Sequence, residues 1–143
     1  MDKVWPMAEK NYTHRDVLDK LGITPGDALA LAGDNGYLDA ALRSRILDRI
    51  GRPLAQDDEN LDVALVEVDE GADVVATLKQ WRKRLAPAGG IWLLTRKRGW
   101  PGYVDQNLLI NAGPAARVVD NKICSVSDNV SAMRFVIRRV DRK

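Results

Sequence analysis

The stretch LAPAGGIWLLT, residues 85–95, decides the fold of this chain. A helical pattern of apolar residues leads into it, and Pro87 ends that helix because proline lacks the backbone N–H that a helix needs. Two glycines then turn the chain into IWLLT, a short apolar run typical of a strand covered on both faces. We therefore predict a helix over about residues 72–86 and a buried strand over residues 90–95.

The alternation of strand and helix extends upstream from this stretch. LDVALVEV, residues 61–68, is nearly continuous in apolarity, and DALALA, residues 27–32, follows a Pro–Gly turn; both predict strands. Between them, apolar side chains recur every four residues from Leu38, which predicts a helix over about residues 37–50. Strand, helix, strand, helix and strand in this order form a parallel sheet with right-handed crossovers.

The C-terminal third adds a hairpin to this sheet. We predict a helix over about residues 105–111, then strands over residues 117–126 and 132–140 joined by a turn at residues 127–129. The expected fold class is α/β. We expect a mainly parallel sheet of about five strands, with a C-terminal antiparallel hairpin and helices on both faces.

The length and composition of the chain limit which class of protein it can belong to. A chain of 143 residues with 45% hydrophobic and 29% charged residues has the size and usage of one soluble domain. We expect a tail over residues 1–12 and one domain over residues 13–143, which opens with a helix capped by Thr13. No apolar run is long enough to cross a membrane, the N-terminus has no secretory pattern, and a single cysteine fits a reducing compartment. We therefore expect a cytoplasmic protein.

Two resemblances rest on the stretch at residues 85–95 and on the hairpin. Pro…Gly-Gly before a buried strand, followed by a hairpin, is similar to the C-terminal half of the methyltransferase-type Rossmann fold over roughly residues 61–140. LAPAGGIWLLTRKR, VDNKICSVSDNVSAMRFVIRR (residues 119–139) and LGI-x-PGDALALAG resemble a family of small bacterial proteins known as domain of unknown function 3052. Val130 stands where that family often carries a tryptophan. The second resemblance implies a truncated Rossmann-like fold and no particular activity.

The methyltransferase resemblance raises the question of an S-adenosylmethionine site. Such a site needs a glycine-rich turn after the first strand, so that the backbone can approach the ligand, and an acidic residue after the second strand to hold the ribose. The first turn, AGDNG at residues 32–36, has two glycines without the close Gly-x-Gly-x-Gly spacing. Two interpretations stay open: a degenerate cofactor loop with Asp34 facing a ligand, or a turn in which Asp34 or Asn35 caps the next helix.

The second strand of such a site has one candidate, residues 52–56. Four residues separate it from the strand at Leu61, and four extended residues span about 14 Å. A return to the start of a parallel neighbour needs a strand length of about 17 Å plus lateral travel. Residues 52–56 are therefore a short edge piece, an antiparallel hairpin partner or a loop, and the acidic cluster Asp57–Asp58–Glu59 lies in a turn.

Ligands of open parallel sheets bind outside the carboxyl ends of the strands. Here those ends carry Asp34, then Asp69 and Glu70, then Thr95 with the basic residues after it. A rim with acids on one side and bases on the other could hold a zwitterion or a phosphorylated metabolite. The alternative interpretation is that these residues are ordinary surface charges on loops. The candidate ligand-binding residues are Gly33, Asp34, Gly36, Asp69, Arg96 and Lys97.

Polar residues within the hairpin form a second candidate site. Asp120, Asn121 and Lys122 interrupt an apolar strand and need partners if they are covered. Either they form a site with Arg134 on the facing strand, or they are the exposed face of an edge strand that Lys122 protects from pairing. An exposed edge there also predicts a homodimer.

Single residues offer little further chemistry. His14 is the only histidine and has no evident partner, so we expect no metal site, and Cys124 reads as a small core residue. No nucleophile, acid and base converge, so catalytic residues stay unassigned. Basic clusters at residues 82–84, 96–98 and 138–143 allow nucleic-acid binding, but a net charge of only +2 and the lack of a known motif do not favour it.

Three functions follow from this sequence, in order of preference. The first is a non-catalytic binding or regulatory module on a degenerate methyltransferase-like scaffold, with an unknown small-molecule or protein partner and no cofactor. The second is a divergent S-adenosylmethionine-dependent methyltransferase of a small molecule, using the rim of Asp34, Asp69 and Arg96. The third is weak nucleic-acid binding through the basic clusters. No membrane partner is expected.

Overall fold

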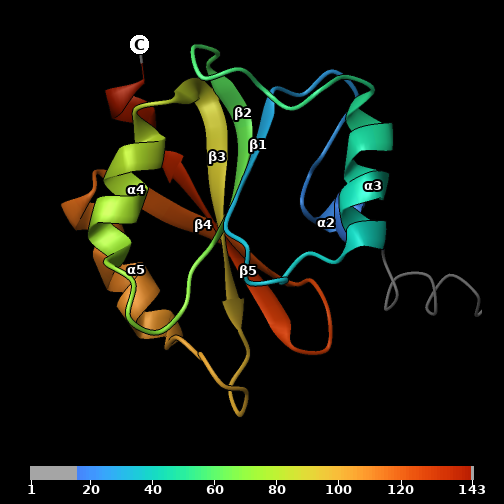
Figure 1. Cartoon of the computed structure of the whole chain (residues 1–143). Helices are drawn as coiled ribbons and strands as arrows, with labels where there is room; N and C mark the ends of the chain where they lie inside the picture. Colours follow the sequence, from blue (N-terminus) through green and yellow to red (C-terminus); the bar gives the residue numbers. More distant parts are fainter. Residues whose placement is uncertain (1–15, 143) are drawn as a thin grey trace, which may run out of the picture.

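The computed structural model describes residues 16–142 as a five-stranded sheet with helices on both faces (Figure 1). The strands lie in the order β1-β2-β3-β5-β4. The first three run parallel, and β5 is antiparallel to both β3 and β4. This arrangement confirms the predicted α/β class and the C-terminal hairpin. The strands are β1 (Leu29–Ala32), β2 (Leu61–Glu67), β3 (Leu85–Arg96), β4 (Val118–Ser125) and β5 (Val130–Ile137).

Every α-helix of the described part begins at an aspartate whose side chain accepts a hydrogen bond from a backbone N–H in the first turn. Such a bond satisfies a donor that has no partner inside the helix. Asp39 caps the helix after β1, so the interpretation in which Asp34 or Asn35 caps it is wrong. The elements are α2 (Val17–Lys20, cap Asp16), α3 (Ala40–Ile50, cap Asp39), α4 (Val74–Arg82, cap Asp73), α5 (Gln106–Ala115, cap Asp105) and the 3-10 turn η1 (Arg139–Asp141).

The helix that leads into residues 85–95 ends earlier than its pattern predicts. α4 ends at Arg82 and β3 begins at Leu85, so PAGG lies inside the strand rather than before it. In the register between β2 and β3, four residues of β3 stand opposite one residue of β2, which forms a bulge. Pro87 is tolerated there because a bulge leaves N–H groups out of the ladder. Gly89 is required there, since a Cβ would lie 2.3 Å from the carbonyl oxygen of Leu61.

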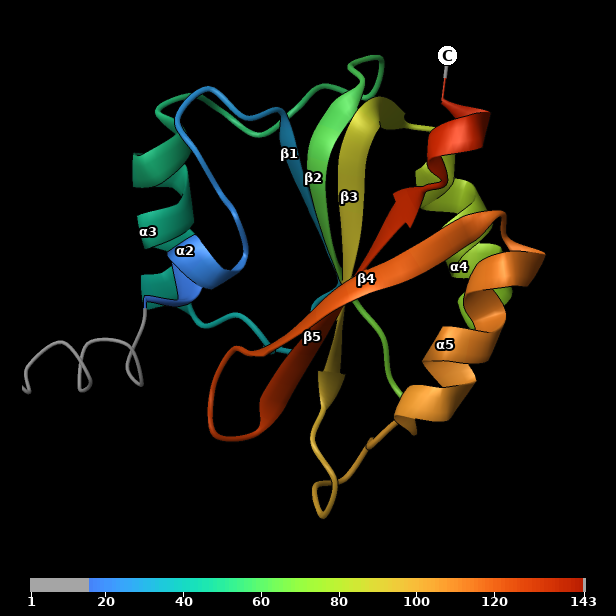
Figure 2. The same ribbon diagram turned by 180° about the vertical axis from the view of Figure 1, so that it is seen from behind.

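The sheet separates two apolar cores. α2 and α3 cover one face of the sheet, and α4 and α5 cover the other (Figure 2). Leu78 of α4 and Leu109 of α5 pack in one core, and Ile46 of α3 packs in the other with residues of α2. Alternation along β3 sends Leu93 to the first core and Trp92 to the second. The central strands are therefore covered on both faces, as their apolar runs predict.

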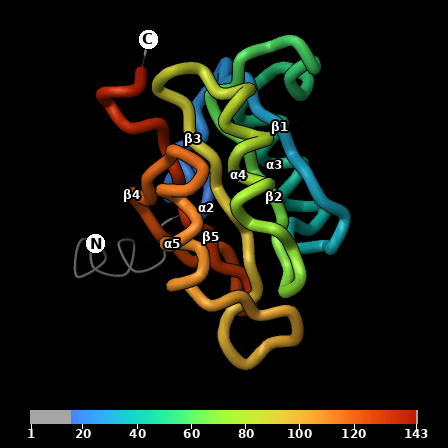
Figure 3. The backbone as a smooth tube through the Cα atoms, turned by 90° about the vertical axis from the view of Figure 1, so that its left-hand side faces the viewer, coloured from blue at the N-terminus to red at the C-terminus, as the bar shows by residue number. Residues whose placement is uncertain are grey.

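The two helical crossovers have opposite hands, which corrects the expectation that both are right-handed. β1, β2 and β3 step across the sheet in one direction, yet α3 covers one face and α4 covers the other (Figures 1 and 3). The connection through α4 is right-handed, and the connection through α3 is left-handed. Because about 98% of such connections are right-handed, the path through α3 needs a specific cause.

The segment after α3 supplies that cause. Residues 51–60 run past the free edge of β1, where the Ala55 N–H donates to the Leu29 carbonyl oxygen at 2.9 Å. Ala55 also packs against the core on the α4 side, so the chain has passed around the sheet edge before β2 begins. Of the three alternatives for residues 52–56, the structure has a loop, which is joined to β1 by this backbone hydrogen bond.

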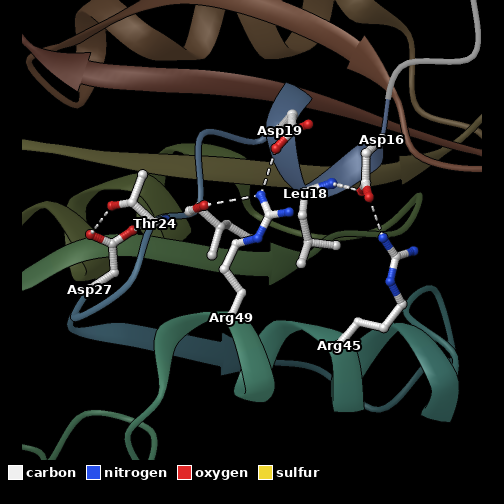
Figure 4. Close-up of polar contacts among 8 residues, drawn as sticks. Asp16, Leu18, Asp19, Thr24, Asp27, Arg45 and Arg49 are labelled. Carbon is white, nitrogen blue, oxygen red and sulfur yellow. Dashed lines mark hydrogen bonds and ion pairs between the residues drawn. The ribbon is translucent and has the colours of Figure 1, made fainter. Parts of the chain in front are cut away.

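Ion pairs fix α2 against α3 (Figure 4). Arg45 and Arg49 of α3 reach the carboxylates of Asp16 and Asp19 on α2. Asp16 also caps α2, and the hydrogen bond from the Leu18 N–H holds the pKa of its carboxyl below the usual value, with the Arg45 charge acting in the same direction. The pairing ties a four-residue helix to the longer one beside it.

The first helix of the described part, predicted to be capped by Thr13, is capped by Asp16 instead, so that prediction is wrong. Two expectations fall outside the described residues: the tail over residues 1–12 and the surroundings of His14. Over residues 16–142, no helix is both long enough and apolar enough to cross a membrane.

Candidate functional site

The carboxyl ends of β1, β2 and β3 meet at one edge of the sheet, where ligands of open parallel sheets bind. The turn at residues 33–36 directly follows β1. Gly33 has a left-handed backbone with a φ of 109°, and a Cβ there would lie 2.6 Å from the Cβ of Glu67 at the end of β2. The turn and Glu67 are therefore in direct contact, and only glycine fits at this position.

The Glu67 carboxylate is buried under this turn. Its side chain is 1% exposed, and its Oε2 lies 3.6 Å from Nη2 of Arg43 on α3. Oε1 accepts a hydrogen bond from the Asn35 N–H at 2.7 Å, while Oε2 has no hydrogen-bond partner in the described part of the chain. The Glu67 carboxylate thus accepts a hydrogen bond from a backbone N–H of the turn. Such N–H groups are what a glycine-rich turn presents to a ligand.

Two of the candidate ligand-binding residues, Asp34 and Gly36, are exposed in the same turn. Within residues 16–142, the Asp34 carboxylate takes part in no hydrogen bond or ion pair. A role for either residue in ligand binding stays a prediction.

The edge between the ends of β1 and β3 carries three side chains that lie near one another, those of Tyr37, Arg96 and Asp69. The Arg96 guanidinium lies over the Tyr37 ring, 4.6 Å from its centre. A Cβ at Gly102 would lie 3.6 Å from the Tyr37 hydroxyl and 4.0 Å from the Asp69 Cβ, so the loop after β3 lies against both residues. Burial raises the pKa of the Tyr37 phenol; the Arg96 charge opposes this, and the charges of Asp69 and Glu67 raise the pKa further.

Replacing Tyr37 by phenylalanine is expected to change how stability depends on alkaline pH. Because the pKa of Tyr37 is raised in the folded protein, the unfolded chain loses the phenol proton first, and the wild type loses stability as pH rises above about 10. Urea unfolding between about pH 8 and pH 11 measures this loss. The variant should show a shallower decline, and equal slopes for the two proteins would contradict it.

A cavity of about 330 Å³ opens beside this edge, on the α5 side of the sheet. It lies between the end of β3, the start of α5 and the two hairpin strands. Arg96 and Lys97 line it, and the Lys97 Nζ donates to the Ser125 Oγ at 2.7 Å. Ligand pockets in proteins measure about 300–1,000 Å³, so this cavity has room for a small molecule. Gly33, Asp34 and Asp69 do not line it.

The second candidate cluster is divided between the two faces of the hairpin. The register between β4 and β5 shifts at Asn121, so Asp120 pairs with Phe135 and Lys122 pairs with Arg134. Phe135 belongs to the core on the α5 side, and the alternation along β5 puts Arg134 on the opposite face. The structure therefore brings Lys122 and Arg134 together and leaves Asp120 apart from them. Burial lowers the pKa of Arg134, and a ligand at this pair stays a prediction.

Two of the three basic clusters, those that begin at Arg82 and Arg138, make contacts within the chain. Arg82 and Arg84 donate to the backbone carbonyl oxygens of Arg117 and Gln56, and Arg138 pairs with the carboxylate of Asp141 in η1. These contacts give no support to nucleic-acid binding.

The single cysteine and the metal-ligating side chains form no candidate site in the described part of the chain. The Cys124 thiol is half-buried on β4, and burial raises its pKa, which disfavours the reactive thiolate. From residue 16 to residue 142, no three His, Cys, Asp or Glu side chains lie together in a way that could hold a metal ion.

Comparison with known proteins decides the family. The family model described as "Protein of unknown function (DUF3052)" matches residues 18–139. The chain belongs to the DUF3052 family. Uncharacterised proteins of Mycobacterium tuberculosis and Mycobacterium bovis are 32% identical to it over 120 residues, which cover 82% of this chain and 75% of each relative. The family resemblance inferred from the sequence is confirmed.

Solved methyltransferases share the fold of this DUF3052 chain. Mitomycin 7-O-methyltransferase MmcR matches with a TM-score of 0.62 at 12% identity, over 92% of this chain and 55% of its own. CalO1, a methyltransferase of calicheamicin biosynthesis, gives 0.58 at 14% identity with the same coverage. Aeropyrum pernix fibrillarin with bound S-adenosyl-L-methionine gives 0.58 at 13% identity, over 87% of this chain and 75% of its own. The DUF3052 chain therefore has a Rossmann-like, methyltransferase-type fold and spans just over half the length of the first two enzymes.

Sequence reasoning missed Glu67 and Tyr37 of this DUF3052 protein. A signal for Glu67 was present, because a carboxylate at the end of an apolar strand needs a partner once it is covered. Gly33 was noted as part of a possible cofactor loop, although its missing side chain makes room for that glutamate. For Tyr37 the sequence carries no signal, since its burial depends on the loop that follows β3.

Proposed function

We propose that this DUF3052 protein is a non-catalytic binding module, in which a methyltransferase-like scaffold has lost its cofactor site. The position of Glu67 supports this most directly. Its buried carboxylate accepts the Asn35 N–H and lies against Gly33. In dinucleotide-binding sheets the corresponding turn faces the ligand. Here a side chain of the protein itself takes that place.

S-adenosylmethionine does not fit the residues present at this edge. The Asn35 N–H of the turn is already bonded to the Glu67 carboxylate, so this donor is not free for a ligand. β1 is the outermost strand of the described sheet, so no strand beyond it carries an acid over a ribose. The acids that follow α3 in the sequence, Asp57–Glu59, lie in a loop. There Arg52 binds Glu59 at 2.6 Å and holds the pKa of that carboxyl below its usual value.

The cellular setting is part of the proposal. A single cysteine fits a reducing compartment, and we therefore place the module in the cytoplasm.

Isothermal titration of the full chain with S-adenosylhomocysteine tests the proposal. We expect no heat of binding with ligand in the millimolar range, because the turn already holds Glu67. An active S-adenosylmethionine-dependent methyltransferase, titrated from the same ligand stock, serves as the positive control. Micromolar binding that disappears in Asp34→Ala would mean that the turn is a working cofactor loop. The protein would then be a divergent methyltransferase of a small molecule.

A further inference from the structure

The cavity between β3, α5 and the hairpin has an apolar floor and a polar wall. Leu109 and Met133 belong to the adjacent core and form part of the floor, and Ile123, which is 49% exposed, extends it. Thr95 and Ser131 stand opposite each other in the register of β3 and β5, and both line the wall. Such a lining suits a ligand with an apolar body and one polar end.

Thr95 is the residue that points to a ligand. It is only 5% exposed, and the alternation along β3 directs its side chain to the same face as Leu93, where the cavity lies. Its hydroxyl makes no hydrogen bond to any residue between 16 and 142. The hydroxyl oxygen keeps some exposure, and the cavity is where a bound polar group can reach it.

The rim of the cavity favours an anion. Lys97 and Arg98 line it against a single carboxylate, that of Asp105. Arg96 also lines it, but its guanidinium lies over the Tyr37 ring. Asp105 is already engaged as the cap of α5, since its carboxylate accepts the Asn107 N–H at 2.8 Å. The ten-residue helix α5 adds the partial positive charge of its N-terminus at the same rim. Lys97 and Arg98 against one carboxylate leave the rim positive.

We propose that this cavity binds a small organic anion. Its carboxylate or phosphate group lies toward Thr95 and the basic rim, and its apolar body covers the floor. The volume of about 330 Å³ is near the lower end for ligand pockets, which suits a molecule of about one ring. This site rests on the proposed function, because it gives the binding module a ligand class.

Nuclear magnetic resonance titration of the isotope-labelled full chain tests the site with benzoate and phenyl phosphate as probes, and with neutral benzamide as the matched control. We expect either anion to shift the backbone amide signals of residues 95–98 and 105–107, and benzamide to leave them in place. The probe with the higher affinity tells whether the site prefers a carboxylate or a phosphate.

Two variants locate the binding. Thr95→Val keeps the shape of the side chain and should weaken anion binding about tenfold, because it removes a hydrogen bond to a charged group. Arg98→Gln should weaken it about threefold, as expected for one partly solvated charge. Arg139→Gln removes an exposed arginine beyond the far end of β5 and should leave the affinity unchanged.

Several outcomes would overturn the site: no shifts with either anion, equal shifts with benzamide, or an affinity that Thr95→Val and Arg98→Gln both leave unchanged. If Thr95→Val fails to fold, the Arg98→Gln result decides alone. Failure here leaves the S-adenosylhomocysteine titration untouched, because the two ligands are assigned to different parts of the sheet edge. A failed site and a failed non-catalytic proposal are therefore distinguishable.

Discussion

Replacing Gly89 by alanine is expected to lower the free energy of unfolding by about 3 kcal/mol or to prevent folding. The added Cβ would lie 2.3 Å from the carbonyl oxygen of Leu61 and 3.2 Å from that of Ala86. Both are backbone atoms, so no side-chain rotation relieves the contact. β2 and β3 would have to separate at the bulge. Urea unfolding followed by circular dichroism measures the loss.

Gly71→Ala is the matched control for this substitution. Gly71 lies in the loop before α4, and no atom lies within 4 Å of a Cβ built there. Its replacement should change the free energy of unfolding by no more than about 0.5 kcal/mol. Equal effects of the two substitutions would contradict the tight packing of the bulge.

Replacing Trp92 by alanine is expected to cost about 3–5 kcal/mol of stability. Trp92 is 1% exposed and lies in the core between the sheet and α2–α3. Its Nε1–H donates to the Leu21 carbonyl oxygen at 3.0 Å, which ties the end of α2 to the middle of the sheet. Removal of the side chain leaves a cavity in this core and an unpaired carbonyl at its border. Urea unfolding measures the sum of both effects.

Trp92→Phe separates the two contributions. Phenylalanine keeps much of the apolar contact but cannot donate to Leu21, so we expect a smaller loss of about 1–3 kcal/mol. A loss below about 1 kcal/mol for the alanine variant would contradict the burial of Trp92.

Much of the fold could be predicted because its signals are local. Apolar runs and turn residues located all five strands and the hairpin turn. The end of α4 was predicted too late because Trp81 and Leu85 continue its apolar stripe, whereas Leu85 already pairs with Leu61 in the sheet. The left-handed crossover was also missed, since it depends on where residues 51–60 pass and not on any residue pattern.

The site was less predictable because its parts are distant in sequence. Arg96 and Lys97 were predicted because charged residues after a buried strand mark its carboxyl end; both line the cavity, and their role in binding stays a prediction. In the sequence, Glu67 is an ordinary residue at the end of a strand. Its contacts with Asn35 and Gly33 join residues more than thirty positions apart, so no local pattern reveals them. Asp120 and Lys122 are two apart and were grouped together, but a bulge between them puts them on opposite faces.

The path of the chain after α3 also indicates where this domain could grow. α3 covers the face that a right-handed connection to a strand outside β1 would use, yet the chain turns back to β2. In doubly wound sheets of the order 3-2-1-4-5-6, two strands lie outside the first. The domain thus has the form of such a sheet without its outer pair of strands. Residues 51–60 connect α3 directly to β2, where the two missing strands would otherwise be inserted. A strand–helix–strand unit inserted in this loop would add to the open side of β1 and leave both cores intact.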